Sequence, residues 1–123
     1  LERAVSEGHN GVDEDVLFHR AIAEAAQNPF LMSTLDYLAQ FLKGATRVTR
    51  ANEARRADFM DAVRTEHQTI VEAIEKGDAT AARAAAACHM DNAVARIEEA
   101  DPSFWQSEGV QLAHPLVSRL SVN

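Results

Sequence analysis

Three short breaks divide this chain into segments of helical length, and they constrain its fold more than any other feature. Asn28-Pro29 and Gly77-Asp78 both join a helix stop to a helix start, and Asp101-Pro102 stops the last long helix. Between the breaks, apolar residues recur every three or four positions, which is the helical period. We therefore predict four helices, over about residues 13–27, 30–50, 53–76 and 79–99.

The composition agrees with a single all-helical domain. Of the 123 residues, 46% are hydrophobic but only 6% are aromatic, which favours helices over a β-sandwich. We predict an all-α antiparallel helical bundle of residues 1–99, followed by a C-terminal tail of residues 100–123. The tail contains Phe104, Trp105 and Leu112, so it either folds back over the bundle or forms a short helix. Because the opening residues 1–5 look like the end of a helix, we expect the domain to be incomplete at its N-terminus.

One helix of this bundle has a continuous apolar stripe. The leucines at positions 31, 35, 38 and 42 step by four, three and four residues, so they share one face of the helix. We expect this stripe to lie in the core or to form a dimer seam.

Charge and cysteine content exclude several classes of protein. The net charge of -7 opposes a phosphate-binding surface, so we do not expect this chain itself to bind DNA. Its single cysteine, Cys88, excludes an internal disulfide. No stretch approaches the roughly 18 apolar residues of a membrane span, and no secretory leader opens the sequence. We expect a cytoplasmic protein without membrane contact.

Three of the five histidines lie on helix faces that otherwise point inward. Asp15 precedes His19 by four residues, so both side chains leave the same face of one helix. His67 precedes Gly77 by ten residues and His89 follows it by twelve, so the two are nearly level in an antiparallel hairpin. Asp15, His19, His67 and His89 can therefore share one layer of the bundle.

One carboxylate and three imidazoles in one layer suit a borderline divalent metal ion. Zinc is the first candidate, with nickel, manganese and iron as alternatives, because the ligand set alone does not choose among them. An open position on a buried cation attracts a carboxylate, so a small organic acid is the expected effector. The alternative is that each buried histidine only forms a hydrogen bond with a backbone carbonyl.

Four further polar residues are candidates for contact with such an acid. Arg47 and Arg50, near the end of the second predicted helix, could pair with its carboxylate, and Thr46 could donate a hydroxyl. Asn92 lies one turn after His89 and could contact the effector or orient a metal ligand. A solvated helix end is the alternative for the two arginines.

Taken in order, several motifs resemble the FCD domain, the effector-binding C-terminal domain of FadR-like regulators in the GntR family. The resemblance spans Asp13 to Ile97. It rests on Asp15-Val16-Leu17-Phe18-His19, Asn28-Pro29-Phe30-Leu31, Glu66-His67-Gln68-Thr69-Ile70-Val71-Glu72-Ala73-Ile74, Gly77-Asp78 and His89.

The resemblance implies a metal site and a regulatory function. In metal-containing members, an aspartate and three histidines at these motif positions hold the cation, which implies ligation by Asp15, His19, His67 and His89. The resemblance also implies a homodimer that reaches DNA through an N-terminal winged helix-turn-helix domain absent from this sequence. A small carboxylate entering the helical cavity would then change DNA binding.

Two other functions compete with this sensor. A small helical metalloenzyme could use the same ligands to activate water. We do not predict an enzyme, because Glu66 and Glu72 are expected to fall off the apolar stripe of their helix and so leave no buried general base. A metal-free structural module is the third reading.

Overall fold

The computed structural model describes residues 3, 9 and 11–120, and these residues form helices without any strand. The all-α prediction is therefore confirmed. The predicted end of a helix at residues 1–5 lies outside the described residues, apart from Arg3. The helices are α2 (Val12–Ala25), α3 (Pro29–Glu53), α4 (Ala57–Glu75), α5 (Ala79–Glu98), α6 (Pro102–Gln106) and α7 (Glu108–Leu120).

The expected caps divide the chain as the sequence predicts. Asn28 Oδ1 accepts hydrogen bonds from the backbone N–H groups of Phe30 and Leu31, at 3.0 and 3.2 Å, and so begins α3. Gly77 has a φ of +69° directly after α4, the left-handed conformation that glycine adopts without strain. The carboxylate of Asp78 then caps α5. Local sequence therefore explains both sharp turns.

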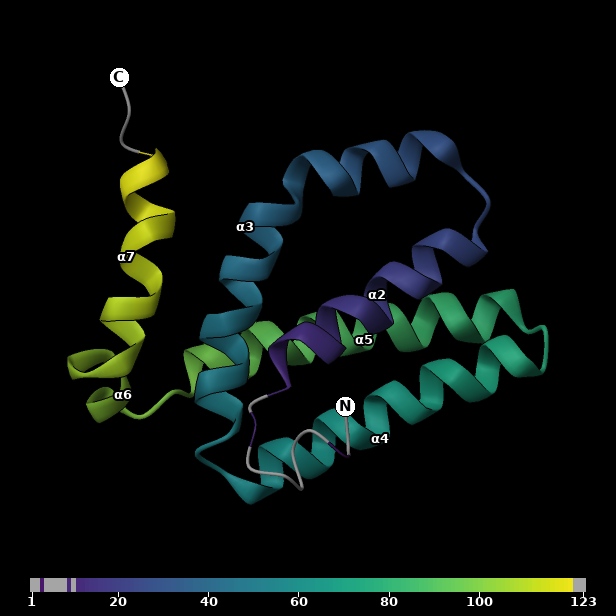
Figure 1. Cartoon of the computed structure of the whole chain (residues 1–123). Helices are drawn as coiled ribbons and strands as arrows, with labels where there is room; N and C mark the ends of the chain where they lie inside the picture. The colour runs from purple at the N-terminus through teal and green to yellow at the C-terminus, as the bar shows by residue number, and fades with distance from the viewer. Residues whose placement is uncertain (1–2, 4–8, 10, 121–123) are drawn as a thin grey trace.

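Two helical hairpins make up the body of the molecule (Figure 1). The helices α4 and α5 run antiparallel along each other, and α2 packs against the first half of α3. The helix α3 bends near its middle, and its second half packs against both α5 and α7. This arrangement brings α2, α4 and α5 together on one side of α3. Within the described part of the chain, no helix is long and apolar enough to span a membrane.

The boundary between α3 and α4 differs from the sequence prediction. Instead of ending near Arg50, α3 continues to Glu53, and α4 begins only at Ala57. Contacts with α5 stabilise the extra turn, because Asn52 Nδ2 donates to the carbonyl oxygen of Arg96 at 2.9 Å. The Glu53 side chain, only 5% exposed, is also paired with Arg96. These partners come from a distant part of the sequence, so local periodicity does not reveal them.

The C-terminal residues form two helices that cover the second half of α3. Phe104 of α6 is fully buried against Val48 and Ala51 of α3. Leu112 and Leu116 of α7 pack on the same cluster. Residues 102–120 therefore add their own apolar surface to the core.

The leucine stripe of α3 does not lie in the core of this chain, so the first of its two expected roles is wrong, and the dimer seam remains a prediction. Leu31, Leu38 and Leu42 remain 39%, 37% and 41% exposed. Leu35 and Leu42 instead line a cavity between α3 and the layer that contains Asp15, His19 and His89. The cavity beside this stripe is also bordered by residues of α2, α4 and α5.

Candidate metal centre and adjoining cavity

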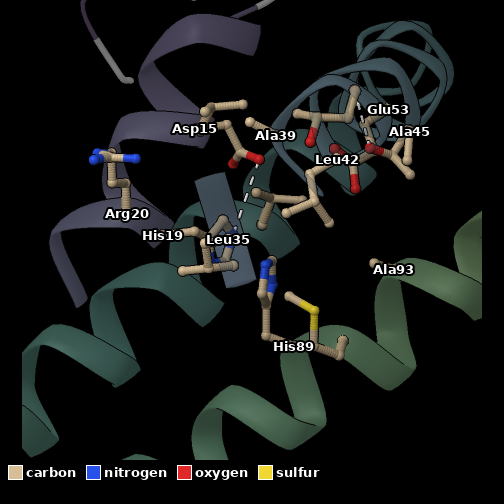
Figure 2. A pocket seen from close by; sticks show the side chains of 15 residues that line it. Asp15, His19, Arg20, Leu35, Ala39, Leu42, Ala45, Glu53, His89 and Ala93 are labelled. Atoms are coloured by element: carbon tan, nitrogen blue, oxygen red, sulfur yellow. Dashed lines mark hydrogen bonds and ion pairs between the residues drawn. The ribbon is translucent and has the colours of Figure 1, made fainter. Parts of the chain in front are cut away.

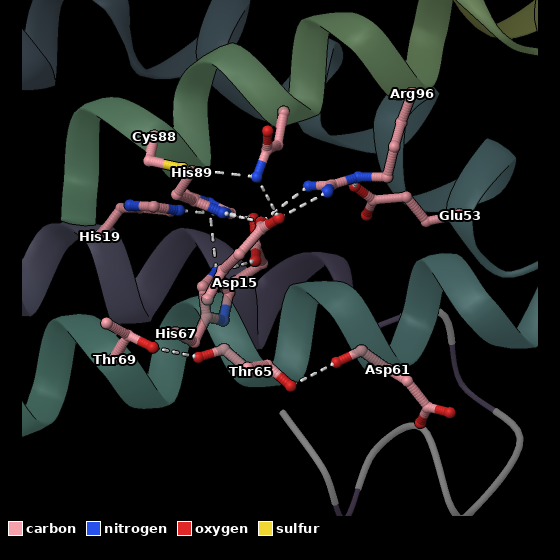
Figure 3. Close-up of polar contacts among 12 residues, drawn as sticks. Asp15, His19, Glu53, Asp61, Thr65, His67, Thr69, Cys88, His89 and Arg96 are labelled. Carbon is pink, nitrogen blue, oxygen red and sulfur yellow. Dashed lines mark hydrogen bonds and ion pairs between the residues drawn. The ribbon is translucent and has the colours of Figure 1, made fainter. Parts of the chain in front are cut away.

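Four side chains from three helices converge on one point between α2, α4 and α5 (Figure 3). The ligand nitrogens of His19, His67 and His89 lie within 4.8 Å of one another. The Nε2 atoms of His67 and His89 are 3.2 Å apart. Asp15 Oδ1 lies 3.5 Å from His67 Nε2, and Asp15 Oδ2 lies 3.9 Å from His19 Nε2. The structure thus brings together the four residues that the sequence placed in one layer.

Helical spacing and packing explain why these histidines point inward. On α4, His67 falls between Val63 and Ile70, at steps of four and three residues, so it shares their buried face. The ring of Phe18 stacks on the ring of His67, with centroids 4.3 Å apart. His89 of α5 is 5% exposed and faces His67 across the hairpin. Packing in the core and contacts between the rings therefore orient His67 and His89.

Burial favours the neutral, metal-binding form of two of these histidines. For His67, burial together with the nearby His89, His19 and Arg50 lowers the pKa to about 3. Burial also lowers the pKa of His19, which Asp15 partly offsets and His89 reinforces. A neutral imidazole keeps a lone pair on its unprotonated nitrogen, and a metal ion requires that lone pair.

The convergent donor atoms fit a divalent metal ion. Ligand atoms that share one zinc ion at about 2.1 Å lie about 3–4 Å apart. The distances of 3.2 Å between His67 and His89, 3.5 Å between Asp15 and His67, and 3.9 Å between Asp15 and His19 fall in this range. Three imidazole nitrogens and one carboxylate oxygen also match the preference of borderline metals such as zinc. The site is mostly buried, yet it borders a cavity, so a bound ion could keep a position open.

A chain of buried ion pairs adjoins the histidines, and sequence reasoning missed it. Glu66 Oε2 lies 2.7 Å from His89 Nδ1, and the Glu66 side chain is only 13% exposed. Glu66 also pairs with Arg96, which pairs with Glu53, which in turn pairs with Arg50. The expectation that Glu66 falls outside the buried layer is therefore wrong. It lies at the edge of the buried face of α4, where α5 covers it.

The two carboxylates in this row of ion pairs, Glu66 and Glu53, respond differently to burial. Burial alone would raise the pKa of Glu66, but hydrogen bonds from Arg96, His89 and Asn92 outweigh it and lower the pKa. For Glu53, burial dominates and raises the pKa, although Arg50 and Arg96 oppose this effect. Glu66 is thus strongly stabilised as an acceptor of hydrogen bonds.

A cavity of about 390 Å³ opens beside the histidines (Figure 2). Asp15, His19 and His89 line one part of it. One face of α3 lines the cavity at steps of four and three residues, through Leu35, Ala39, Leu42, Thr46, Thr49 and Glu53. This face changes from apolar to polar toward the C-terminal end of α3. Glu53 and His19 lie on opposite sides of the view in Figure 2.

Only one of the four expected effector contacts lines this cavity. Thr46 does, beside Thr49. Arg47 is exposed and lines a separate groove between α3 and α7. Arg50 is 2% exposed and does not line the cavity itself, although it pairs with Glu53, which does. Asn92 donates to Glu66 Oε1 at 2.8 Å, so it contacts the ion-pair chain.

Sequence spacing contained a signal for the residues that were missed. Arg96 follows His89 by seven residues, and Glu53 follows Thr46 by seven, so each lies two turns along the same helix face. Charged residues that continue a buried face are candidates for paired, buried ions. The pairing itself depends on three helices that meet only in the folded chain.

Comparison with known proteins identifies the family. The family model described as the FCD domain matches residues 1–92, which is 92 of the 123 residues. Relatives in Escherichia coli (strain K12) and Shigella flexneri are each described as a candidate regulatory protein of the L-lactate dehydrogenase operon. Each is 33% identical over 76 residues, covering 62% of this chain and 30% of the relative. No solved structure shows a significant match. The resemblance predicted from the motifs is therefore confirmed, and the chain belongs to the FCD domain family.

Proposed function

We propose that this chain is the effector-binding domain of a transcription regulator, and that it holds a divalent metal ion at which a small organic acid binds. The proposal rests on the convergence of His19, His67 and His89, whose ring nitrogens lie within 4.8 Å of one another, with Asp15 3.5 Å from His67 and 3.9 Å from His19. Four separately placed polar side chains rarely meet in a core unless they share a ligand, because unpaired buried polar groups are costly.

Zinc is the metal we propose first, with nickel, manganese and iron as alternatives. The four side chains would supply three nitrogens and one oxygen. A bound divalent cation would supply positive charge that holds an acid in otherwise apolar surroundings. A cation that can hold an acid supports a role in sensing such a ligand. The relatives described as regulatory proteins support the same class of function.

The polarity of the cavity narrows the class of acid. The side of the cavity formed by Asp15, His19 and His89 would bind the carboxylate of the acid through the metal ion. The apolar part of α3 would contact the carbon atoms of the acid. At the other end, each Glu53 oxygen accepts one hydrogen bond from an arginine and can accept another. A ligand hydroxyl could donate to Glu53, whereas a second carboxylate would meet like charge. We therefore propose a hydroxy acid as the effector. Lactate is itself a hydroxy acid, and the relatives' described operon suggests it as a probe.

The decisive experiment measures the metal content of purified, tag-free protein. We expect about one metal ion per chain in the wild type, and loss of the ion in both Asp15→Ala and His67→Ala. Chelation should lower the melting temperature of the wild type but not of the two variants. The matched control is His114→Ala, which removes an exposed histidine of α7 and should retain the ion.

Absence of metal from the wild type, even after incubation with zinc, would refute the metal site. Equal retention of metal by His67→Ala and the wild type would refute the assignment of ligands. In either case, the chain would remain a helical FCD domain whose ligand binds by other contacts.

A pair of matched acids tests the proposed effector class. We expect 6-hydroxyhexanoate to raise the melting temperature of the zinc-loaded protein more than adipate does, because adipate places a second carboxylate near Glu53. Lactate serves as a short hydroxy-acid probe. In Glu53→Gln, which removes the charge, the preference between the two longer acids should shrink. A stronger response to adipate in the wild type would contradict the hydroxy-acid assignment.

The remaining proposals concern the full-length regulator. The matched region is only 30% of the length of the relatives, so most of each relative lies outside it. We propose that the domain acts in a cytoplasmic homodimer whose winged helix-turn-helix domain binds DNA. Exposed aromatic side chains on α3 support a covered surface in the assembly, since Phe30 is 83% and Tyr37 is 87% exposed.

A further inference from the structure

His89 is the one histidine of the cluster whose two ring nitrogens both have described polar partners. Its Nε2 atom faces the Nε2 atom of His67 at 3.2 Å. Its Nδ1 atom lies 2.7 Å from Glu66 Oε2. The orientation of this ring is therefore set from outside the ligand layer as well as from within it.

The Glu66 carboxylate has no capacity left for a metal ion. Oε1 accepts from Asn92 Nδ2 and Arg96 Nη1, both at 2.8 Å. Oε2 accepts from Arg96 Nη2 at 3.0 Å and contacts His89 Nδ1. These four contacts use the roughly four acceptor sites of a carboxylate. Glu66 thus acts on His89 rather than on a cation.

These contacts determine which nitrogen of His89 carries the proton. A carboxylate that receives two hydrogen bonds from an arginine can only accept, so His89 Nδ1 must donate. In the neutral ring, Nε2 then lacks a proton, and its lone pair points toward His67 and the common point. Without Glu66, the proton could move to Nε2 and block that lone pair.

The support for Glu66 comes from two other helices. Arg96 of α5 holds Glu66 on α4 and, through its Nε atom, Glu53 on α3 at 2.9 Å. Figure 3 shows His89, Arg96 and Glu53 along this row. Arg96 is 7% exposed, so bulk water does not compete for these contacts. The carboxylate is therefore fixed relative to the hairpin that carries His67 and His89.

We propose that Glu66 is a positioning residue for the metal centre, which holds His89 in the tautomer and orientation that present Nε2 to the ion. This inference rests on the proposed function, because it assumes that the cluster binds a metal. It assigns Glu66 a role distinct from that of the four ligands.

The test compares Glu66→Gln with the wild type in zinc affinity, measured by competition with a chromophoric chelator. We expect binding that is about 10–100-fold weaker, as is typical when a partner of a ligating histidine is lost. Glu72→Gln is the matched control, because it makes the same change at an exposed site on α4 and should retain wild-type affinity. Long-range proton–nitrogen NMR spectra of the metal-free proteins report the His89 tautomer directly. We expect Nδ1–H in the wild type and a mixture of tautomers in Glu66→Gln.

The outcomes separate this inference from the proposed function. If the wild type binds no zinc, the proposed function fails, and the positioning role fails with it. If the wild type binds zinc and Glu66→Gln binds as tightly, only the positioning role is overturned. An Nε2–H tautomer in the wild type would overturn it as well. A purely structural role would lower the melting temperature of the metal-free variant but leave the zinc-induced rise and the tautomer unchanged.

Discussion

Replacing Arg96 with methionine is expected to lower the free energy of unfolding by about 3–5 kcal/mol, because it removes the arginine that pairs with Glu66 and one of the two that pair with Glu53. Arg96 is 7% exposed, and its guanidinium contacts Glu53 at 2.9 Å and Glu66 at 2.8 Å. Methionine conserves much of the side-chain length, so the loss reports the charge more than the packing. Urea denaturation of the metal-free protein measures the effect.

Two further variants separate the charge effect from a general effect of the substitution. Arg83→Met makes the same change at an exposed position of α5 and should alter stability by less than about 0.5 kcal/mol. Combining Arg96→Met with Glu66→Gln should recover part of the loss, because one uncompensated charge is then removed. A loss in Arg96→Met as small as that in Arg83→Met would show that the ion-pair chain does not stabilise the helices.

The metal-free protein is expected to lose stability steeply between about pH 6.5 and pH 3, and His67 is expected to contribute much of the loss. The unfolded chain takes up a proton on this histidine near pH 6.5, whereas burial lowers its pKa to about 3 in the folded chain. Between these values the unfolded state binds more protons, so stability falls as the pH falls. One such histidine contributes on the order of 1 kcal/mol for each pH unit.

Denaturation curves at a series of pH values, recorded with a chelator present, test this dependence. The slope of the unfolding free energy against pH should be smaller in His67→Gln than in the wild type. Comparison with the wild type cancels the carboxylates that titrate in the same range. His114→Gln is the matched control, since it removes an exposed histidine. Equal slopes in His67→Gln and the wild type would mean that His67 is readily protonated in the folded protein.

Much of the layer formed by Asp15, His19, His67 and His89 followed from the sequence because helical geometry is regular. Asp15 and His19 are one turn apart, and His67 and His89 are nearly equidistant from Gly77. A capped, tight turn fixes the register of a helical hairpin, so distance from the turn predicts which residues are level. The Asn28-Pro29 turn likewise joins α2 to α3, and these two helices pack against each other. The turn residues determine how the two helices of a hairpin align, and this alignment determines which side chains are level.

The residues around this layer could not be predicted from helical spacing and turn positions. Glu66 reads as a surface residue from the periodicity of α4 alone, and its burial depends on α5 lying over it. Arg50 and Arg47 are near neighbours in sequence, yet one is buried in ion pairs and the other is exposed. Arg50 lies among ion pairs that connect through Glu53 to Arg96 of α5, whereas Arg47 lines the groove between α3 and α7, and both contacts join distant segments. The position of the cavity depends equally on the bend in α3.

The sequence by itself determined the helical class, both capped turns and the four side chains that meet between α2, α4 and α5, because these follow from short-range geometry and hydrophobic period. Only the tertiary structure decided where α6 and α7 pack, which leucines of α3 border a cavity, and how Glu53, Glu66 and Arg96 pair. A charge is stable in a buried position only when an opposite charge lies beside it. Here Arg96 is 43 residues from Glu53 and 30 residues from Glu66 in the sequence. Such pairs form when three helices pack, so no local pattern encodes them.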